Sequence, residues 1–173
     1  MPTSCTRLGE IGEWHQQRRR TFGRVEQHGV GGGVFTVLDR NQEEITRRAG
    51  RGIRIHTVAD LNTKRAEELV QGRAKVVADA KEVINNPEIE VVIELIGGYG
   101  IAKELVLAAI NAGKHVLLEK PFTMNAAEAR AIQQAAKARG VFVMEAMWTR
   151  FLPMMDAVMR VISDGTIGVV HTV

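Results

Sequence analysis

The chain has 173 residues, of which 45% are hydrophobic, and it carries a formal net charge of +3 with an isoelectric point near 9.3. This length suits one α/β domain with a sizeable core, and the hydrophobic fraction argues against disorder. The charge is too small, and the basic residues are too scattered, to indicate nucleic-acid binding. No apolar run approaches the ~20 residues of a membrane span. The single Cys5 excludes an intrachain disulfide and fits a reducing cytoplasm.

Residues 1–28 differ from the rest, because they are rich in Arg, Gln, His and Gly and contain no Val/Ile run. From Gly29 onward helix and strand signals alternate, which predicts a parallel sheet with helices on both faces. The expected helices cover residues 31–48, 63–70, 79–86, 101–112, 125–139 and 152–163. The expected strands cover residues 53–58, 75–77, 90–96, 116–118, 141–144 and 169–173.

The glycines that open the first expected helix match part of a dinucleotide-binding fingerprint, in which G-x-G-x-x-G precedes a helix whose N-terminus holds the pyrophosphate. Gly31 fits the third glycine and Gly32 follows it, but Glu26 and His28 occupy the first two positions. A carboxylate there repels the pyrophosphate, and a side chain blocks close approach of the backbone. Residues 20–25 also make a poor central strand, so we expect an incomplete first strand. The alternative is that these glycines only make a flexible helix entry.

Asp60 ends the segment Val58-Ala59-Asp60, where Rossmann folds place a carboxylate on the adenosine ribose. A helix cap is the alternative role for this residue. The segment 115–118 reads as a short buried strand that leads into Lys120 and Pro121. A lysine delivered in this way can act as an acid or base, and the proline fixes the backbone direction after it. The alternative is a surface lysine.

Residues from 29 to about 118 resemble the nucleotide-binding half of bacterial homoserine dehydrogenase, through the segments VGGGVF at 30–35, VAD at 58–60 and VVIELIGGY at 91–99. That family uses NAD(P) to interconvert aspartate semialdehyde and homoserine. The resemblance implies cofactor contact by Gly97 and Gly98, against the alternative of a plain strand-to-helix turn. The family's first strand and first two glycines are missing from the pattern.

Residues from about 111 to 173 resemble the dihydrodiol dehydrogenase branch of the glucose-fructose oxidoreductase/inositol dehydrogenase (Gfo/Idh/MocA) family. The segments EKPFT at 119–123 and MEAMWTRF at 144–151 carry this resemblance. It implies that Glu119, Lys120 and Pro121 lie near the nicotinamide and that Lys120 supports proton transfer. It also implies that Trp148 and Arg150 line the substrate side of the site, against the alternatives of ordinary packing and a solvated cation.

The sequence therefore predicts a Rossmann-like, doubly wound α/β domain at 29–150, after an atypical leader at 1–28 and before a truncated substrate or dimerisation domain that starts at 151–173. We expect an NAD(P)-dependent oxidoreductase, homoserine dehydrogenase-like in its first half, that transfers hydride at a carbonyl or alcohol carbon of a small molecule. The alternatives are a Gfo/Idh/MocA-type sugar or dihydrodiol dehydrogenase, and a non-catalytic nucleotide-binding fragment or rearranged product. We expect NADP or NAD as cofactor, no metal, no nucleic-acid or membrane partner, homo-oligomers as an option, and little activity from the chain alone.

Overall fold

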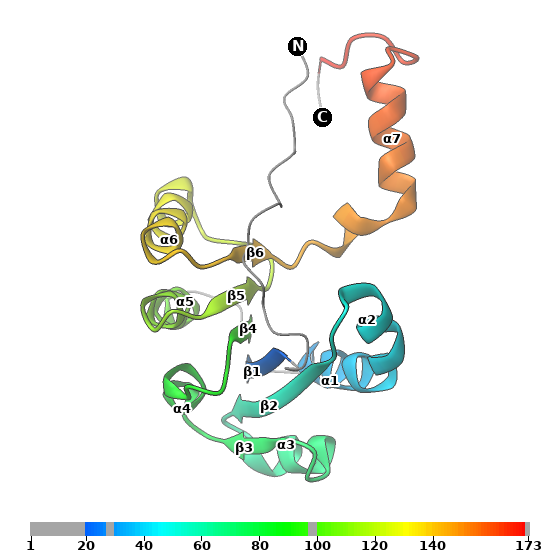
Figure 1. The fold of residues 1–173 in the computed structure, drawn as a ribbon. Coiled ribbons are helices and arrows are strands. Elements are labelled where there is room, and N and C mark those ends of the chain that lie inside the picture. Colours follow the sequence, from blue (N-terminus) through cyan, green and yellow to red (C-terminus); the bar gives the residue numbers. More distant parts are fainter. Residues whose placement is uncertain (1–19, 27–29, 97–99, 172–173) are drawn as a thin grey trace.

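The computed structural model describes residues 20–26, 30–96 and 100–171. Its centre is a six-stranded sheet in the order β3-β2-β1-β4-β5-β6, with every neighbouring pair parallel (Figure 1). This is the strand order of a doubly wound dinucleotide-binding sheet. After β1, the strands β2 and β3 are added on one side, and β4, β5 and β6 are then added on the other side. The strands are β1 (Arg20–Glu26), β2 (Ile53–Asp60), β3 (Lys75–Val77), β4 (Val91–Leu95), β5 (His115–Leu118) and β6 (Val143–Glu145).

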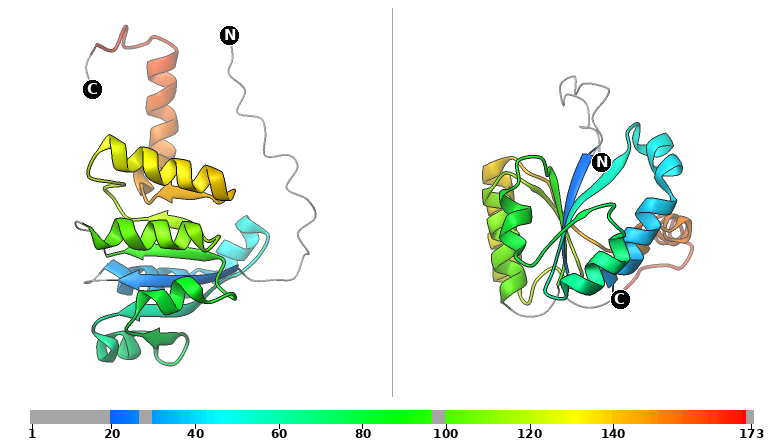
Figure 2. Two further views of the ribbon diagram at one scale, coloured as in Figure 1. Left: turned by 90° about the vertical axis from the view of Figure 1, so that its left-hand side faces the viewer. Right: turned by 90° about the horizontal axis from the view of Figure 1, so that it is seen from below.

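Helices cover both faces of the sheet, as the alternating pattern predicts (Figure 2). The first group, α1 (Val30–Arg40), α2 (Gln42–Ala49) and α3 (Thr63–Val70), lies on one side. The second group, α4 (Ala80–Asn85), α5 (Ile101–Asn111) and α6 (Ala126–Arg139), lies on the other. The doubly wound α/β architecture is therefore confirmed.

The central strand corrects one expectation. Residues 20–26, inside the segment assigned to the leader, form β1 between β2 and β4, so the first strand is present rather than incomplete. Phe22 pairs with Ile55 on one side and Val91 on the other, and the register shifts by one residue between Phe22 and Gly23. Local strand propensity is poor here, but β2 and β4 each need a hydrogen-bonding partner at their buried edge. That tertiary requirement overrides propensity.

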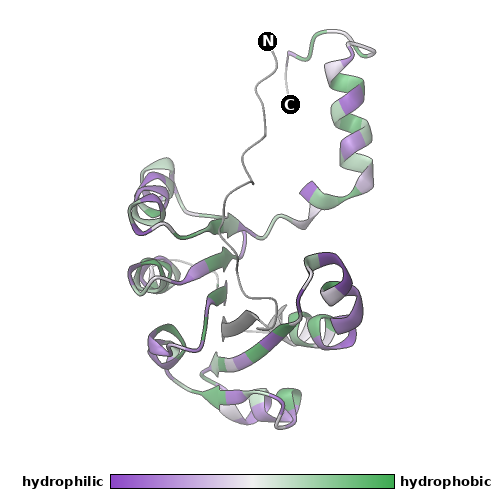
Figure 3. Cartoon of the chain, viewed as in Figure 1, coloured by the Kyte–Doolittle hydropathy of each residue, from purple (hydrophilic) through white to green (hydrophobic). Residues whose placement is uncertain are grey.

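The larger core lies between the sheet and α4, α5 and α6. All five residues of β4 are buried, which explains why this strand reads as a continuous apolar run. Figure 3 shows the same hydrophobic character along β4. The most deeply buried members of this core are Val83, Ile89, Val106, Ala109, Ile110, Val116 and Ile132. A smaller core on the opposite face contains Phe35, Ile55, Val58, Ala66 and Val70.

Side-chain caps fix where several helices begin. Asn62 Oδ1 accepts a hydrogen bond from Arg65 N at 3.2 Å at the start of α3, and Asn125 Oδ1 accepts one from Glu128 N at 3.0 Å at the start of α6. Asn is among the residues preferred at this position, because its side-chain oxygen accepts from a backbone N–H that has no partner within the helix. The single helix expected over 31–48 is instead two helices, α1 and α2, which are separated at Asn41. The Asn41 side-chain amide donates to Val37 O at 2.7 Å and so closes the last turn of α1.

The last described elements are the short 3-10 helix η1 (Trp148–Phe151) and α7 (Pro153–Ser163), which extends away from the sheet (Figure 1). Neither has a buried residue. The strand expected at 169–173 is not found over 169–171, and the last two residues lie outside the described ranges. α7 carries this segment away from the sheet, so no strand edge is beside it to supply hydrogen bonds.

Candidate cofactor and catalytic site

Four strands end together at one edge of the sheet. Glu26, the last residue of β1, pairs in register with Asp60 of β2 and with Leu95 of β4, and Glu94 pairs with Leu118 of β5. Doubly wound sheets bind ligands outside the carboxyl ends of their strands, at the point where the strand order reverses. Here that point lies between β1 and β4, so this edge is the candidate site.

The N-terminus of α1 follows β1 at this edge. Its first turn contains no acidic residue, so its N–H groups and the helix dipole favour an anion. Gly31 and Gly32 lie in this first turn. A Cβ on Gly32 is 3.5 Å from Leu69 Cδ1, an ordinary contact, so packing alone does not require glycine there. His28, the second irregular position of the fingerprint, falls outside the described residues.

Asp60 ends β2 as predicted, and its carboxylate lies at the same edge. Its Oδ1 accepts a hydrogen bond from Asn62 N at 2.8 Å, whereas Asn62 supplies the side-chain cap of α3. Asp60 is therefore not the helix cap itself. Within the described part of the chain, Asp60 Oδ2 has no hydrogen-bond donor, so one oxygen is available for a ligand hydroxyl.

Gly97 and Gly98 lie outside the described residues, but the residues on either side of this gap, Ile96 and Gly100, are described. Glu94, only 2% exposed, accepts a hydrogen bond from Ile96 N at 2.6 Å through Oε1, where β4 ends. The next described residue, Gly100, has φ 90°, which favours glycine, and it caps α5. We did not single out Glu94 from the sequence. The available signal was a carboxylate inside an otherwise apolar strand.

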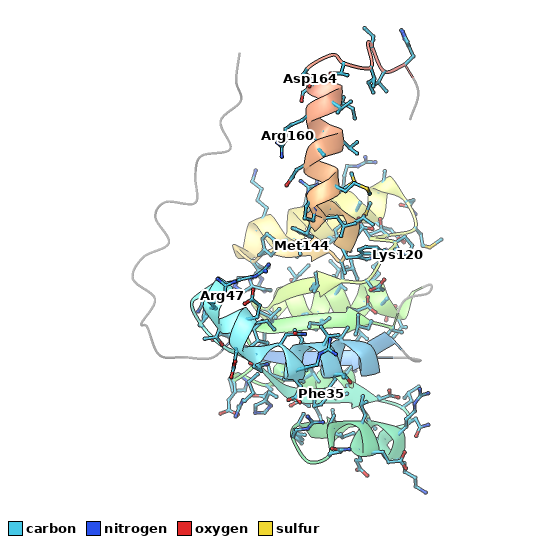
Figure 4. All side chains as sticks on the ribbon, turned by 90° about the vertical axis from the view of Figure 1, so that its right-hand side faces the viewer. Phe35, Arg47, Lys120, Met144, Arg160 and Asp164 are labelled. Atoms are coloured by element: carbon cyan, nitrogen blue, oxygen red, sulfur yellow. The ribbon has the colours of Figure 1, made fainter. Side chains whose placement is uncertain are left out.

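The loop after β5 carries Glu119, Lys120 and Pro121 at the same edge. Glu119 N donates to Glu94 O at 3.0 Å, which ties the start of the loop to the end of β4. Glu119 and Pro121 line a cavity of about 180 Å³ between this loop, α5 and α6, and Glu94 forms part of its wall. Lys120 is exposed (Figure 4), so its amine is accessible to a bound molecule.

Trp148 and Arg150 belong to η1. Arg150 lines an open groove of about 960 Å³. Phe122, on the loop that carries Lys120, and Glu145 line the same groove, so the fold brings Arg150 to the groove beside this loop. Trp148 is 67% exposed, which excludes ordinary core packing in this structure. Glu145 is a second residue that the sequence reasoning missed. Its side chain accepts a hydrogen bond from Phe122 N at 2.8 Å, a contact between residues far apart in the sequence.

Another hollow, of about 720 Å³, lies beside the amino end of β2 and contains none of the predicted site residues. The Arg73 guanidinium lies 4.9 Å from the centre of the Phe35 ring and pairs with Asp39, so its charge is already partnered. Within the described ranges, no group of three His, Cys, Asp or Glu residues is arranged to hold a metal ion. In the same ranges, no helix is long and apolar enough to cross a membrane.

Comparison with known proteins identifies the family. The sequence profile of Gfo/Idh/MocA, described as an oxidoreductase family with an NAD-binding Rossmann fold, matches residues 29–147. The chain belongs to this family. The Rossmann fold of this family accounts for the strand order of the sheet.

Individual relatives show both expected resemblances. The chain is 56% identical over 88 residues to homoserine dehydrogenase of Methylobacillus glycogenes. The aligned residues cover 51% of this chain and 21% of that protein. It is 39% identical over 137 residues to mouse trans-1,2-dihydrobenzene-1,2-diol dehydrogenase, covering 78% of this chain and 38% of that protein. The solved homoserine dehydrogenase of Thiobacillus denitrificans superimposes with a TM-score of 0.68 at 43% identity, over 74% of this chain and 29% of that one. The chain thus spans well under half the length of these relatives.

Proposed function

We propose that the carboxyl edge of the sheet binds NAD or NADP and that the chain takes part in hydride transfer at a carbonyl or alcohol carbon of a small molecule. The observation that carries this proposal is the place of Lys120. It lies two residues after β5, on a loop tied to the end of β4, at the edge where this fold binds its ligand.

Apart from Glu26, whose charge opposes a pyrophosphate, the residues at this edge fit a dinucleotide. The first turn of α1, with Gly31 and Gly32, suits a pyrophosphate because the first amides of a helix have no partner within the helix and this turn carries no acidic side chain. Asp60 Oδ2 suits a ribose hydroxyl, and the resemblance to homoserine dehydrogenase assigns Gly97 and Gly98 to the nicotinamide side. When bound, the cofactor supplies the hydride acceptor or donor.

Lys120 then moves the proton. As hydride leaves the alcohol carbon, its oxygen loses a proton, and Lys120 Nζ accepts that proton; in the reverse direction Lys120 Nζ donates a proton to the carbonyl oxygen. Glu119 and Pro121 hold the backbone on either side of this lysine. This role calls for no metal.

Two substrate classes are proposed, in order. The first is homoserine, after the relatives of the first half. The second is a cyclic diol, and one observation favours it. The exposed Trp148 ring belongs to η1, the same short helix whose Arg150 lines the groove beside the Lys120 loop, and it offers an aromatic face to a ring substrate. The single cysteine supports a cytoplasmic location. We also propose homo-oligomers as an option for this chain.

The test is the rate of cofactor reduction with homoserine or a trans-dihydrodiol, followed by the absorbance of the reduced nicotinamide. Removing a general acid or base costs about 10²–10⁴-fold, so Lys120→Met should lower the rate by that factor while cofactor affinity changes little. Lys137→Met, an exposed lysine on α6, is the matched control and should leave the rate unchanged. Equal rates for Lys120→Met and wild type contradict the role of Lys120. Cofactor binding without turnover of either substrate indicates the non-catalytic alternative.

A further inference from the structure

Glu145, the last residue of β6, and Ala146, which follows it, hold the chain on both sides of Lys120. Two residues before Lys120, the carbonyl of Leu118 accepts a hydrogen bond from Ala146 N at 2.7 Å. Two residues after it, Phe122 N donates to Oε1 of Glu145 at 2.8 Å. The β5–β6 register also pairs Leu118 with Glu145. The segment that carries Lys120 is therefore fixed at both ends by one short edge strand.

Of these two hydrogen bonds, only the one from Phe122 N to Glu145 uses a side chain as the acceptor. A backbone N–H that donates to a carboxylate makes a charge-assisted hydrogen bond, which is roughly twice as strong as a neutral one. Glu145 is half-buried and forms part of the wall of the open groove together with Phe122. In Figure 4, Lys120 lies on the loop next to the strand that carries Met144, the residue before Glu145.

A second carboxylate holds the far end of the same loop. Glu128 Oε2 accepts a hydrogen bond from Met124 N at 3.3 Å, and its Oε1 pairs with Lys103 Nζ at 3.3 Å. This contact acts four residues from Lys120 and is longer than the bond to Glu145. Glu145 is therefore the side chain that constrains the backbone nearest to the lysine.

We propose that Glu145 is a positioning residue for Lys120: its carboxylate fixes the Phe122 amide and so holds the Lys120 amine toward the bound cofactor. The inference rests on the proposed function. Glu145 acts through the loop, so its removal should change the orientation of Lys120 more than the affinity for the cofactor.

Two readouts on the full chain test this role. The first is hydrogen exchange of the Phe122 amide. The second is protection of Lys120 by NADH against an amine-reactive ester, quantified by mass spectrometry at equal cofactor occupancy. The variants are Glu145→Leu, which removes the acceptor, and Glu145→Gln, whose amide oxygen still accepts. Asp164→Leu is the matched control, because Asp164 Oδ1 also accepts a backbone N–H, from Thr166 at 2.9 Å, at the far end of α7 (Figure 4).

We expect Glu145→Leu to speed exchange of the Phe122 amide by about tenfold or more and to abolish the protection of Lys120. Glu145→Gln and Asp164→Leu should keep both values near those of wild type. Wild-type values for Glu145→Leu, or equal losses for Leu and Gln, overturn the proposal. If Glu145→Leu does not fold, Glu145→Asn replaces it, because its amide oxygen is one methylene short; the same loss is expected, and unchanged values again overturn the proposal.

The two proposals fail in distinguishable ways. If wild type does not bind NADH, the proposed function fails and the positioning role fails with it. If wild type binds NADH and protects Lys120, and Glu145→Leu does so equally, only the role of Glu145 fails.

Discussion

Glu26 and Asp60 are register partners at the ends of β1 and β2, and Leu95 of β4 lies on the other side of Glu26. Two adjacent strands therefore each end in an acidic residue at the edge proposed to bind the cofactor. Asp60 is where a Rossmann fold uses a carboxylate on the ribose, but Glu26 stands where a glycine normally lets the pyrophosphate approach. The two residues should thus have opposite effects on cofactor binding.

Glu26→Gln should strengthen cofactor binding, because it removes a negative charge next to the pyrophosphate position. At the effective dielectric of a protein surface, we expect the dissociation constant for NADH to fall by about three- to tenfold, less at high salt. Isothermal titration of NADH into both proteins measures this. Glu90→Gln removes the same charge at the opposite edge, before β4, and should leave the affinity unchanged. Equal affinities for Glu26→Gln and wild type show that the Glu26 charge does not reach the cofactor.

Asp60→Ser should shift cofactor preference from NADH toward NADPH. The carboxylate suits a free ribose hydroxyl and repels a 2′-phosphate, and Lys64 and Arg65 follow on α3 as cations. We expect the ratio of the two affinities to change by about tenfold, which corresponds to about 1.4 kcal/mol. Competition titrations with both cofactors give this ratio. A variant that loses both affinities equally indicates that Asp60 maintains the turn at Asn62 rather than selects the cofactor.

Lys114 should stabilise the fold from the edge opposite the site. It is 8% exposed, and its Nζ donates to the carbonyls of Asn86 and Ile89 at 2.7 Å each. Lys114→Met leaves two carbonyls without their donor, which should lower the free energy of unfolding by about 1–3 kcal/mol at neutral pH. Urea unfolding measures this value. No loss of stability contradicts the importance of these two bonds.

The same lysine predicts a pH dependence. Burial lowers the pKa of Lys114 below its usual 10.5, because desolvation disfavours the ammonium form. Between the lowered pKa and 10.5 the unfolded chain therefore binds more protons than the folded one, so stability rises with pH in that window. A neutral amine keeps two N–H donors for the two carbonyls. The stability advantage of wild type over Lys114→Met should thus grow as pH rises toward 10.5, and a shrinking advantage contradicts this account.

Most elements after residue 50 follow from local sequence signals. The helix α6 begins at its Asn125 cap, and α5 is followed by Gly113 at φ 76°, so residues close in sequence set both boundaries. β1 could not be predicted in this way. Its sequence lacks a β-branched run, and it is a strand because β2 and β4 flank it, which is a property of distant segments.

In the candidate site, too, some residues could be predicted from local sequence and others could not. Asp60 and Lys120 were predictable, because a residue at the end of a parallel strand, or just after it, lies at the carboxyl edge whatever the details of packing. The bond from Phe122 to Glu145 was not, because it depends on the pairing of β5 with β6 and on one side-chain conformation. A carboxylate at the end of a short apolar strand was the only local hint.

The most direct test of the central claim is a thermal melt of the purified chain with increasing NADH and, separately, NADPH. A ligand that binds only the folded state stabilises it by about 2.7 kcal/mol at one hundred times its dissociation constant. We predict a cooperative melt whose midpoint rises with cofactor concentration, more for NADH than for NADPH. A cooperative melt whose midpoint moves with neither cofactor contradicts the claim that this edge of the sheet binds a dinucleotide.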